Sequence, residues 1–356
     1  NINNLIFSTK TTDNQNLGNF VSSVTQLNNS FTISLDKNHK MNFKTLSKNI
    51  QINSNSIVMS NFTFYISPQD NWFTWDGNKI TGLTDLGKQQ SYIVLPAKTT
   101  DIANDVFANN YLVTYVDMSL TQIRRIPDGV ASRTSLFYKS SLKQIILPPL
   151  LEYIGAWTFA NSNLRLISTP KKTISIGDYA FYDTHNVNIN QDFINKVSVI
   201  GNGVFEQVEF SDLSLDLSNV SSIGHSVFSG SWIKSVILPN TMTSIPNNLF
   251  YNTKYLQSVS IPNSVTSIGS FAFAKSNLNK IIIPEGVTAI RSYAFENTGP
   301  NLYLYLPNSI TIIEKNALAG LGNSGARIYV KKNHPSNLEY LIRNAGYDKQ
   351  YALWIY

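Results

Sequence analysis

Residues 145–159 read Ile-Ile-Leu-Pro-Pro-Leu-Leu-Glu-Tyr-Ile-Gly-Ala-Trp-Thr-Phe, and this pattern returns along the chain. It recurs as Val-Ile-Leu-Pro…Ile-Pro-Asn-Asn-Leu-Phe at 236–250, as Val-Ser-Ile-Pro…Ile-Gly-Ser-Phe-Ala-Phe at 259–273 and as Ile-Ile-Ile-Pro…Ile-Arg-Ser-Tyr-Ala-Phe at 281–295. Self-similarity at a fixed period is the sequence signature of a repeat protein. The chain is therefore predicted to consist of repeated structural units.

Three positions keep the same spacing in successive units. The first is a closing residue, found at Phe107, Phe137, Phe159, Phe181, Phe205, Phe228, Phe250, Phe273, Phe295 and Leu318. The second is an isoleucine five residues earlier, found at Ile102, Ile154, Ile176, Ile200, Ile223, Ile245, Ile268, Ile290 and Ile313. The third is a proline six residues before that isoleucine, found at Pro96, Pro148, Pro170, Pro239, Pro262, Pro284 and Pro307. Apart from one step of 30, the closing residues are 22–24 residues apart.

Units of this length predict a solenoid in which each unit forms one coil. A unit of 22–24 residues is too short for a strand, a full helix and two loops. One coil cannot bury its apolar face without a neighbour on each side. The Leu-x-x-Ile-x-Leu-Pro stretch, as at 142–148, indicates a short strand that ends at proline, which has no N–H for the ladder. The predicted fold is a mostly β solenoid of stacked parallel strands.

The phased isoleucines and phenylalanines are predicted to form buried columns, each ring lying over its counterpart one coil away. Glycine follows the isoleucine in five units, at Gly155, Gly177, Gly201, Gly224 and Gly269. A required left-handed turn is excluded there, because Pro246 occupies the same phase and proline is held at a φ of about −65°. Glycine is expected at this position for its small size or its turn preference.

The phrase Leu-x-x-Ile-x-Leu-Pro-x5-Ile-Gly-x-x-Ala-Phe resembles the BspA-like (Treponema pallidum type) leucine-rich repeat. The segment 75–84, Trp-Asp-Gly-Asn-Lys-Ile-Thr-Gly-Leu-Thr, is similar to the lead-in of bacterial members. The resemblance covers about 80–319. It implies a curved leucine-rich repeat solenoid on a secreted or surface-anchored bacterial protein that adheres to host proteins or other cells. The family has no shared catalytic residues to carry over.

Three regions are expected along the chain. Residues 1–79 show period-2 alternation with polar breaks, as at 31–35 and 62–66, which predicts a small N-terminal β domain that also caps the first coil. Residues 80–319 hold about ten repeats, with a protruding loop around 127–134. Residues 320–356 are predicted to form a C-terminal cap with one short helix over about 336–344.

The composition argues against several kinds of function. The chain has no cysteine, so thiol catalysis, disulfides and cysteine-bound zinc are excluded. The net charge is +6, without the dense basic runs that nucleic-acid binding requires. No apolar run is long enough for a transmembrane segment, and no signal peptide is visible at Asn1. The four histidines lie in different repeat phases and no catalytic motif is present, so we expect no metal, no cofactor and no enzyme activity.

Two sets of residues are candidates for ligand binding. The position two residues before the phenylalanine is aromatic in two neighbouring pairs, Trp157 with Tyr179 and Phe271 with Tyr293. These side chains either contact a protein or sugar, or cover the wall between coils. On the strands, the residues expected to face outward form an apolar concave stripe flanked by lysines, comprising Ile146, Ile237, Ile282, Tyr305, Lys143, Lys234 and Lys280. This stripe is either a protein-contact face or sheet filler.

The sequence leaves three functions open. The first is a cell-surface adhesin that binds a host or neighbouring-cell protein, with its signal or anchor outside these residues. The second is a structural subunit of a surface coat that self-associates. The third, with less support, is glycan recognition by the paired aromatic residues. An extracellular, cell-surface location is expected in each case.

Overall fold

The computed structural model describes the backbone of strands within residues 4–66 and all of 70–129, 134–210, 214–347 and 354–355. The chain divides into two compact units, Asn1–Gln69 and Asp70–Tyr356. The first unit holds two small sheets. One has the order β1 (Asn4–Ser8), β6 (Ser56–Ser60) and β5 (Ile50–Asn53), and the other has the order β2 (Val21–Leu27), β3 (Ser30–Leu35), β4 (His39–Lys44) and β7 (Tyr65–Ile66).

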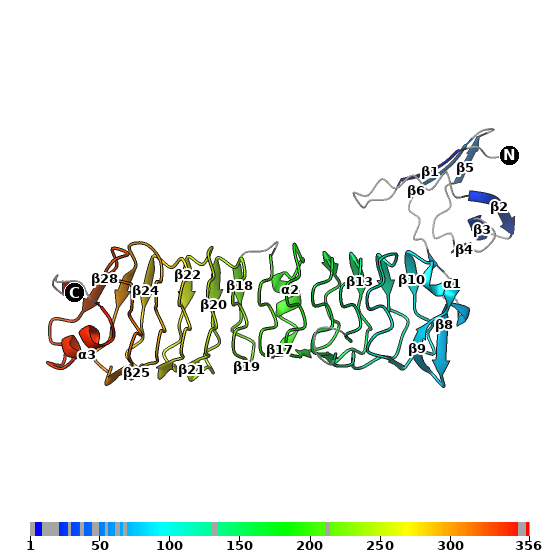
Figure 1. Ribbon diagram of the computed structural model, residues 1–356. Coiled ribbons are helices and arrows are strands. Elements are labelled where there is room, and N and C mark those ends of the chain that lie inside the picture. Colours follow the sequence, from blue (N-terminus) through cyan, green and yellow to red (C-terminus); the bar gives the residue numbers. More distant parts are fainter. Residues whose placement is uncertain are drawn as a thin grey trace. The chain divides into compact units, whose positions relative to one another are not determined.

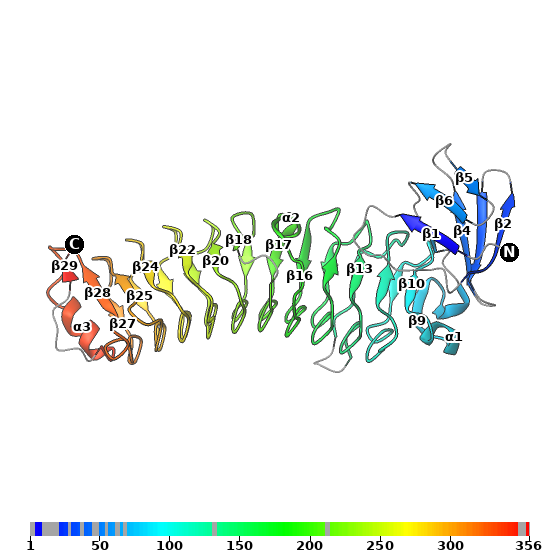
Figure 2. The same cartoon turned by 90° about the horizontal axis from the view of Figure 1, so that it is seen from above.

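The second unit is a solenoid of about eleven turns over its described residues (Figures 1 and 2). It starts with a 3₁₀ turn, η2 (Asp70–Trp72), and the antiparallel hairpin β8 (Phe73–Asp76) and β9 (Lys79–Leu83). The helix α1 (Asp85–Lys88) follows. It begins here because the hydroxyl of Thr84 accepts a hydrogen bond from the Gly87 N–H and so caps the first turn.

Two rows of short parallel strands run along this solenoid. The first, which we call the strand row, contains β10 (Tyr92–Val94), β12 (Tyr115–Asp117), β13 (Gln144–Ile146), β15 (Leu166–Ile167), β18 (Ser214–Asp216), β20 (Ser235–Ile237), β22 (Ser258–Ser260), β24 (Lys280–Ile282), β26 (Tyr303–Tyr305), β28 (Arg327–Val330) and β29 (Trp354–Ile355). The second contains β11 (Asp101–Ile102), β14 (Tyr153–Ile154), β16 (Ile174–Ile176), β17 (Val197–Ile200), β19 (Ser222–Ile223), β21 (Ser244–Ile245), β23 (Ser267–Ile268), β25 (Ala289–Ile290) and β27 (Ile312–Ile313). The predicted parallel solenoid is confirmed.

The core is the predicted column of phenylalanines. The nine rings from Phe107 to Phe295 are 0% exposed, and neighbouring ring centroids lie 5.1–5.8 Å apart. Leu318 continues the column and is also fully buried. The isoleucine column is buried as predicted except at Ile223, which is half-buried. Burial of each ring contributes about 1.5–3 kcal/mol, so this column provides a large part of the solenoid's stability.

The glycines after the isoleucines have negative φ, as Pro246 predicts. Their small size is what the fold requires. A Cβ on Gly155 would lie 2.0 Å from the Pro127 carbonyl oxygen, and one on Gly201 would lie 2.8 Å from the Asp178 backbone nitrogen. These positions therefore set the distance at which one coil packs on the next.

The coils that depart from the repeat pattern were only partly predicted from the sequence. The coil that ends at Phe205 lacks the proline, and it contains the short helix α2 (Gln191–Ile194), capped by Asn190. This helix was not predicted. In the C-terminal region, α3 (Leu338–Asn344) starts two residues later than predicted, and β28 and β29 end the strand row. Residues 130–133 of the predicted loop lie outside the described residues, and the predicted domain limits at 79 and 319 stay predictions.

Candidate binding surfaces

Each coil from the one ending at Phe159 onward has a left-handed residue two positions before its buried phenylalanine or leucine. The φ angles lie between 56° and 62° at Trp157, Tyr179, Gly203, Ser226, Asn248, Phe271, Tyr293 and Asn316. A left-handed conformation costs an L-residue about 1–2 kcal/mol, and glycine or asparagine tolerates it best. We call the surface formed by these residues, and by those directly after each buried phenylalanine, the turn face.

Four bulky aromatic residues adopt this unfavourable conformation, and stacking between coils offsets its cost. The rings of Trp157 and Tyr179 lie 4.5 Å apart at 19°, and those of Phe271 and Tyr293 lie 4.7 Å apart at 3°. Offset stacking of this kind contributes about 0.5–1.5 kcal/mol beyond burial. The ring of Tyr179 also lies over Gly203, where a Cβ would overlap it. The structure thus brings the four predicted aromatic residues together in pairs, each side chain half-buried.

Two tyrosines that follow buried phenylalanines extend these pairs into clusters. Tyr182 lies 5.7 Å from Trp157, and Tyr251 lies 6.3 Å from Phe271, both measured between ring centroids. Their hydroxyls accept hydrogen bonds from Gln207 Nε2 (3.1 Å) and Lys275 Nζ (3.2 Å). We call the two clusters together the aromatic band, which comprises Trp157, Tyr179, Tyr182, Tyr251, Phe271 and Tyr293. Sequence spacing did not find the two tyrosines, because this phase also holds alanine, serine and glutamate in other coils.

The outward side of the strand row carries the second predicted set. Ile237 and Ile282 are 47% and 58% exposed, while Ile146 and Tyr305 are half-buried. Their neighbours Val236 and Ile281 face the core, as strand alternation predicts. Lys143 and Lys280 are exposed and Lys234 is half-buried. The role of these residues in binding stays a prediction.

The strand row also carries aromatic pairs that the sequence analysis missed. Tyr92 and Tyr115 stack at 3.8 Å near its start, and Tyr305 and Tyr329 stack at 4.5 Å near its end. Lys280 Nζ lies 5.4 Å from the centroid of the Tyr305 ring, within cation–π distance. Repeat spacing did not reveal these pairs, because the units that contain them differ from one another at the other positions of the strand segment.

A polar ladder links five consecutive coils beside the turn face. Each side chain at this phase accepts a hydrogen bond from the backbone N–H of the next coil. The four bonds are Asn202 N to Asp178 Oδ1 (2.7 Å), His225 N to Asn202 Oδ1 (2.8 Å), Asn247 N to His225 Nδ1 (3.1 Å) and Ser270 N to Asn247 Oδ1 (2.9 Å). The signal was present in the sequence as Asp, Asn, His and Asn one residue after the glycine phase.

A charged bridge joins the coils that end at Phe295 and Leu318. Glu314 accepts hydrogen bonds from Arg291 Nη1 (2.8 Å) and from the backbone and hydroxyl of Ser292 (both 2.8 Å). The Arg291 guanidinium and then Ser292 lower the pKa of the Glu314 carboxyl below its usual range. The stabilisation from these hydrogen bonds is fully present above the pKa that the Glu314 carboxyl has in the unfolded chain. It is lost as the pH falls through the lower pKa that the carboxyl has in the folded protein.

The bridge makes a pH-dependent prediction. Replacing Glu314 with glutamine should lower the free energy of unfolding at pH 7 by about 1 kcal/mol or less, because Glu314 is partly exposed to solvent. The difference from wild type should disappear in acid, below the folded pKa. Denaturant unfolding at several pH values measures it, with Asp76→Asn, at an exposed carboxylate, as the control. A difference that grows in acid would contradict the assignment.

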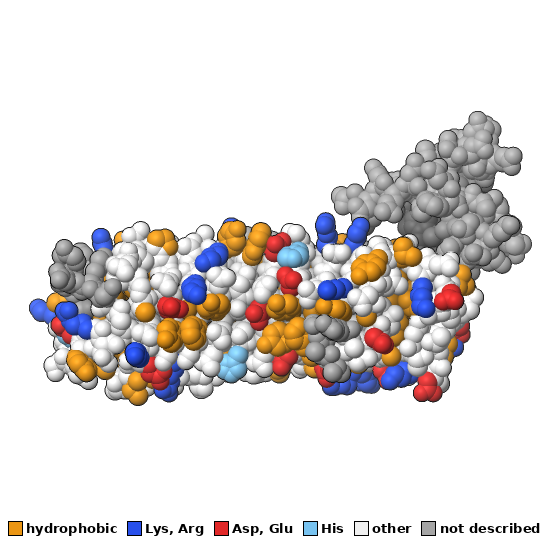
Figure 3. Space-filling view, viewed as in Figure 1, with side chains coloured by type: hydrophobic (Ala, Val, Ile, Leu, Met, Phe, Trp, Pro, Cys, Tyr) orange, Lys and Arg blue, Asp and Glu red, His pale blue; other side chains and the backbone are white. Residues whose placement is uncertain are grey.

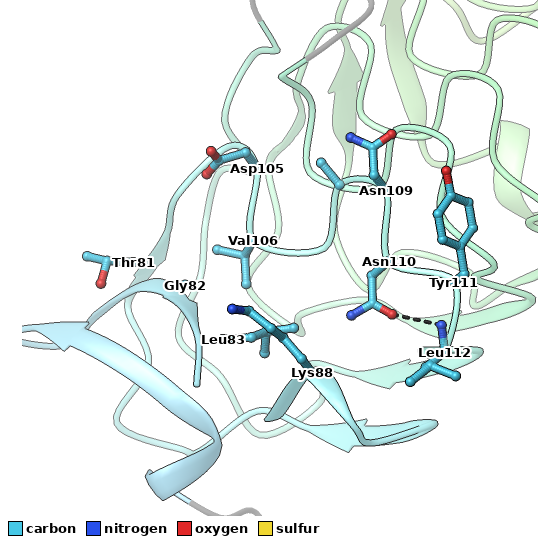
Figure 4. Close-up of a pocket in the computed structure, with 11 residues that line it drawn as sticks. Thr81, Gly82, Leu83, Lys88, Asp105, Val106, Asn109, Asn110, Tyr111 and Leu112 are labelled. Atoms are coloured by element: carbon cyan, nitrogen blue, oxygen red, sulfur yellow. Dashed lines mark hydrogen bonds between the residues drawn. The ribbon is translucent and has the colours of Figure 1, made fainter. Parts of the chain in front are cut away.

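Hollows on the described surface of the solenoid include the following two. The first has a volume of about 590 Å³ and is surrounded by Lys88, Asp105, Asn110, Tyr111 and Leu112 among others (Figure 4). Asn110 Oδ1 holds its wall by accepting a hydrogen bond from the Leu112 N–H (2.9 Å). The second has a volume of about 470 Å³ and is lined by Asp183, His185, Glu206, Gln207, Glu209, Ser229, Gly230, Trp232, Tyr251 and Asn252.

Across residues 70–129, 134–210 and 214–347, no three acidic or histidine side chains gather as a metal site would require. In the described part of the chain, no helix has the length and apolar character needed to cross a membrane.

Comparison with known proteins fits this geometry of short parallel strands and stacked phenylalanines. The model of the BspA type leucine rich repeat region matches in six copies, over residues 87–188, 130–257 and 243–336. These spans cover well over half of the chain. The chain belongs to this repeat family. The search of curated proteins gave no match.

Solved structures similar to this BspA-type chain come from several bacteria. A leucine-rich repeat protein of Bacteroides ovatus is 17% identical with a TM-score of 0.42, covering 94% of this chain and 97% of its own. The pneumococcal vaccine antigen PcpA is 16% identical with a TM-score of 0.41, covering 94% and 99%. A leucine rich cell surface protein of Faecalibacterium prausnitzii is 16% identical with a TM-score of 0.39, covering 92% and 99%.

Proposed function

We propose that the solenoid is a non-catalytic binding module displayed at the cell surface, where it acts as an adhesin for a protein of a host or neighbouring cell. Membership of the BspA-type family supports this, because that resemblance implies a surface-displayed binding solenoid. Stacked coils form a rigid scaffold in which each unit holds its neighbours. Such a scaffold presents side chains at fixed spacing and loses little conformational freedom on binding.

The observation that carries the proposal is the aromatic band. Its rings are half-buried, so each keeps an exposed surface while its orientation is fixed by stacking on the next coil. Interface hot spots are enriched in tryptophan and tyrosine because these side chains supply a large contact area with few rotatable bonds. Four of its six residues, Trp157, Tyr179, Phe271 and Tyr293, occupy left-handed positions where asparagine, serine or glycine would fold with less strain, as they do in other coils.

The strand row offers a second contact area for the same partner. Ile237 and Ile282 expose apolar surface, and Lys143 and Lys234 flank it. Burial of such isoleucines in an interface contributes about 25 cal/mol for each Å² of apolar area removed from water. The lysines then favour partners whose surface is acidic at the matching positions.

The double variant Trp157→Ala/Tyr293→Ala tests the proposal. Wild-type protein should bind immobilised matrix proteins and intact cells, and the double variant should bind at least about tenfold more weakly if each ring contributes about 1 kcal/mol or more. Tyr340→Ala is the matched control, because Tyr340 is 68% exposed on α3, away from the band. Equally poor binding by wild type and double variant would exclude the adhesin role.

A further inference from the structure

The second hollow exists because one coil carries small residues where its neighbours carry large ones. Directly after the buried phenylalanine, the four successive coils have Tyr182, Glu206, Ser229 and Tyr251. Ser229 and the following Gly230 leave space between the larger side chains on either side. The hollow therefore lies, in coil order, between the two clusters of the aromatic band. Strands in adjacent coils are about 4.8 Å apart, so the hollow extends for roughly 14 Å across four coils.

Carboxylates in the hollow differ in how much of their hydrogen-bonding capacity is already used. His185 lies between Asp183 (3.5 Å) and Glu209 (3.2 Å), so these two acids share one partner. Glu206 is half-buried and accepts a hydrogen bond from Ser229, and burial raises the pKa of its carboxyl. Among the described residues, no lysine or arginine lies within ion-pair distance of Glu206, so its oxygens have capacity for further hydrogen-bond donors.

The wall of the hollow supplies an aromatic surface. Trp232 is 43% exposed, and its ring lies 5.1 Å from that of Tyr255 at an angle of 43°. An exposed indole held by a neighbouring ring is a flat apolar platform with a fixed orientation. Figure 3 shows acidic side chains and a histidine close together midway along the solenoid, with hydrophobic side chains on both sides. The protein as a whole is basic, so this local acidic character is a property of the site.

We propose that this hollow binds an uncharged oligosaccharide. The apolar face of a sugar ring would stack on Trp232, and its hydroxyls would donate to Glu206 and exchange hydrogen bonds with Gln207 and Asn252. Hydrogen bonds to a carboxylate are stronger than those to a neutral acceptor. The elongated shape fits several linked rings rather than a single ion. The three carboxylates would repel sialylated or sulfated glycans, and His185 already engages two of them, which disfavours a polycation.

This site goes beyond the proposed protein-binding role. It shares Tyr251 with the aromatic band, but the residues varied here, Trp232 and Glu206, lie outside the band, so either proposal can fail alone. Purified protein is screened on an array of neutral, sialylated and sulfated glycans, with polylysine as a separate probe, and hits are titrated by calorimetry. A neutral glycan should bind, and Trp232→Ala should weaken it by about tenfold, the loss of one stacked ring and its buried area. Trp157→Ala, which removes an indole outside the hollow, should bind the glycan as wild type does.

Glu206→Gln provides a second variant of nearly unchanged shape. It should also weaken glycan binding, because an amide oxygen is a poorer acceptor than a carboxylate. Unchanged circular dichroism spectra and unfolding midpoints establish that both variants fold. The proposal is overturned if no neutral glycan binds to wild type, if both hollow variants bind equally well, or if sialylated glycans or polylysine bind in preference.

Discussion

Replacing Phe250 with alanine should lower the free energy of unfolding by about 3–5 kcal/mol. Its ring is 0% exposed and stacks on Phe228 at 5.6 Å and on Phe273 at 5.5 Å. The substitution therefore leaves a cavity that touches two coil interfaces. Because a solenoid is stable through nearest-neighbour contacts, both interfaces weaken together. Chemical denaturation followed by circular dichroism measures the change.

Phe271→Ala is the matched control for Phe250→Ala. It removes the same side chain two residues before Phe273 of the core column, where the ring is half-buried and stacks on Tyr293 alone among the phased rings. The free energy of unfolding should fall by only about 1–2 kcal/mol, because the substitution removes one stacked pair and a partly buried ring. If the two variants were equally stable, the phenylalanine column would not be the main source of cohesion between coils.

Gly155→Ala should destabilise the solenoid by about 3 kcal/mol or more, although it adds a single methyl group. The new Cβ would overlap the Pro127 carbonyl in the preceding coil, and backbone cannot move aside as a flexible side chain can. The coils would have to separate, which strains hydrogen bonds such as Ile126 N to Tyr153 O at 2.9 Å. Thermal and denaturant unfolding of the variant measure the loss.

Gly77→Ala separates steric overlap from backbone strain. Gly77 has a φ of +57°, and no atom lies within 4 Å of the position its Cβ would take. Alanine there should cost only the left-handed conformation, about 1–2 kcal/mol. A Gly155→Ala variant more stable than Gly77→Ala would show that the glycine phase does not control coil spacing.

The core could be predicted from sequence because burial demands the same residue type in each coil. Ile154 and Phe159 recur at fixed phase, and Pro246 at the glycine phase was enough to exclude a left-handed turn there. The left-handed column two residues before the phenylalanine was not predicted. Asn248 and Gly203 suit that conformation, but Trp157 and Tyr179 at the same phase concealed it, because stacking offsets their strain.

The candidate sites also differ in whether repeat spacing could predict them. The pairs of the aromatic band share one phase, so repeat spacing alone placed Phe271 beside Tyr293. The second hollow depends on Glu206 and Ser229, which share one phase but differ in residue type, and on Trp232 at another phase. No single periodic position reveals it. The helix α2 was missed because its four residues carry too little helical pattern to distinguish them from a turn.

The contact of the Tyr179 ring with Gly203 has a consequence for how this gene can change. Repeats are commonly gained, lost or shuffled by recombination, and identical coils would survive such exchange. Here the turn of one coil contacts the turn of the next coil. The Trp157 ring stacks on Tyr179, and the Tyr179 ring occupies space that only a glycine at position 203 leaves open. A rearrangement that placed a larger side chain after Tyr179 would displace its ring, so these three coils pack together only in this order.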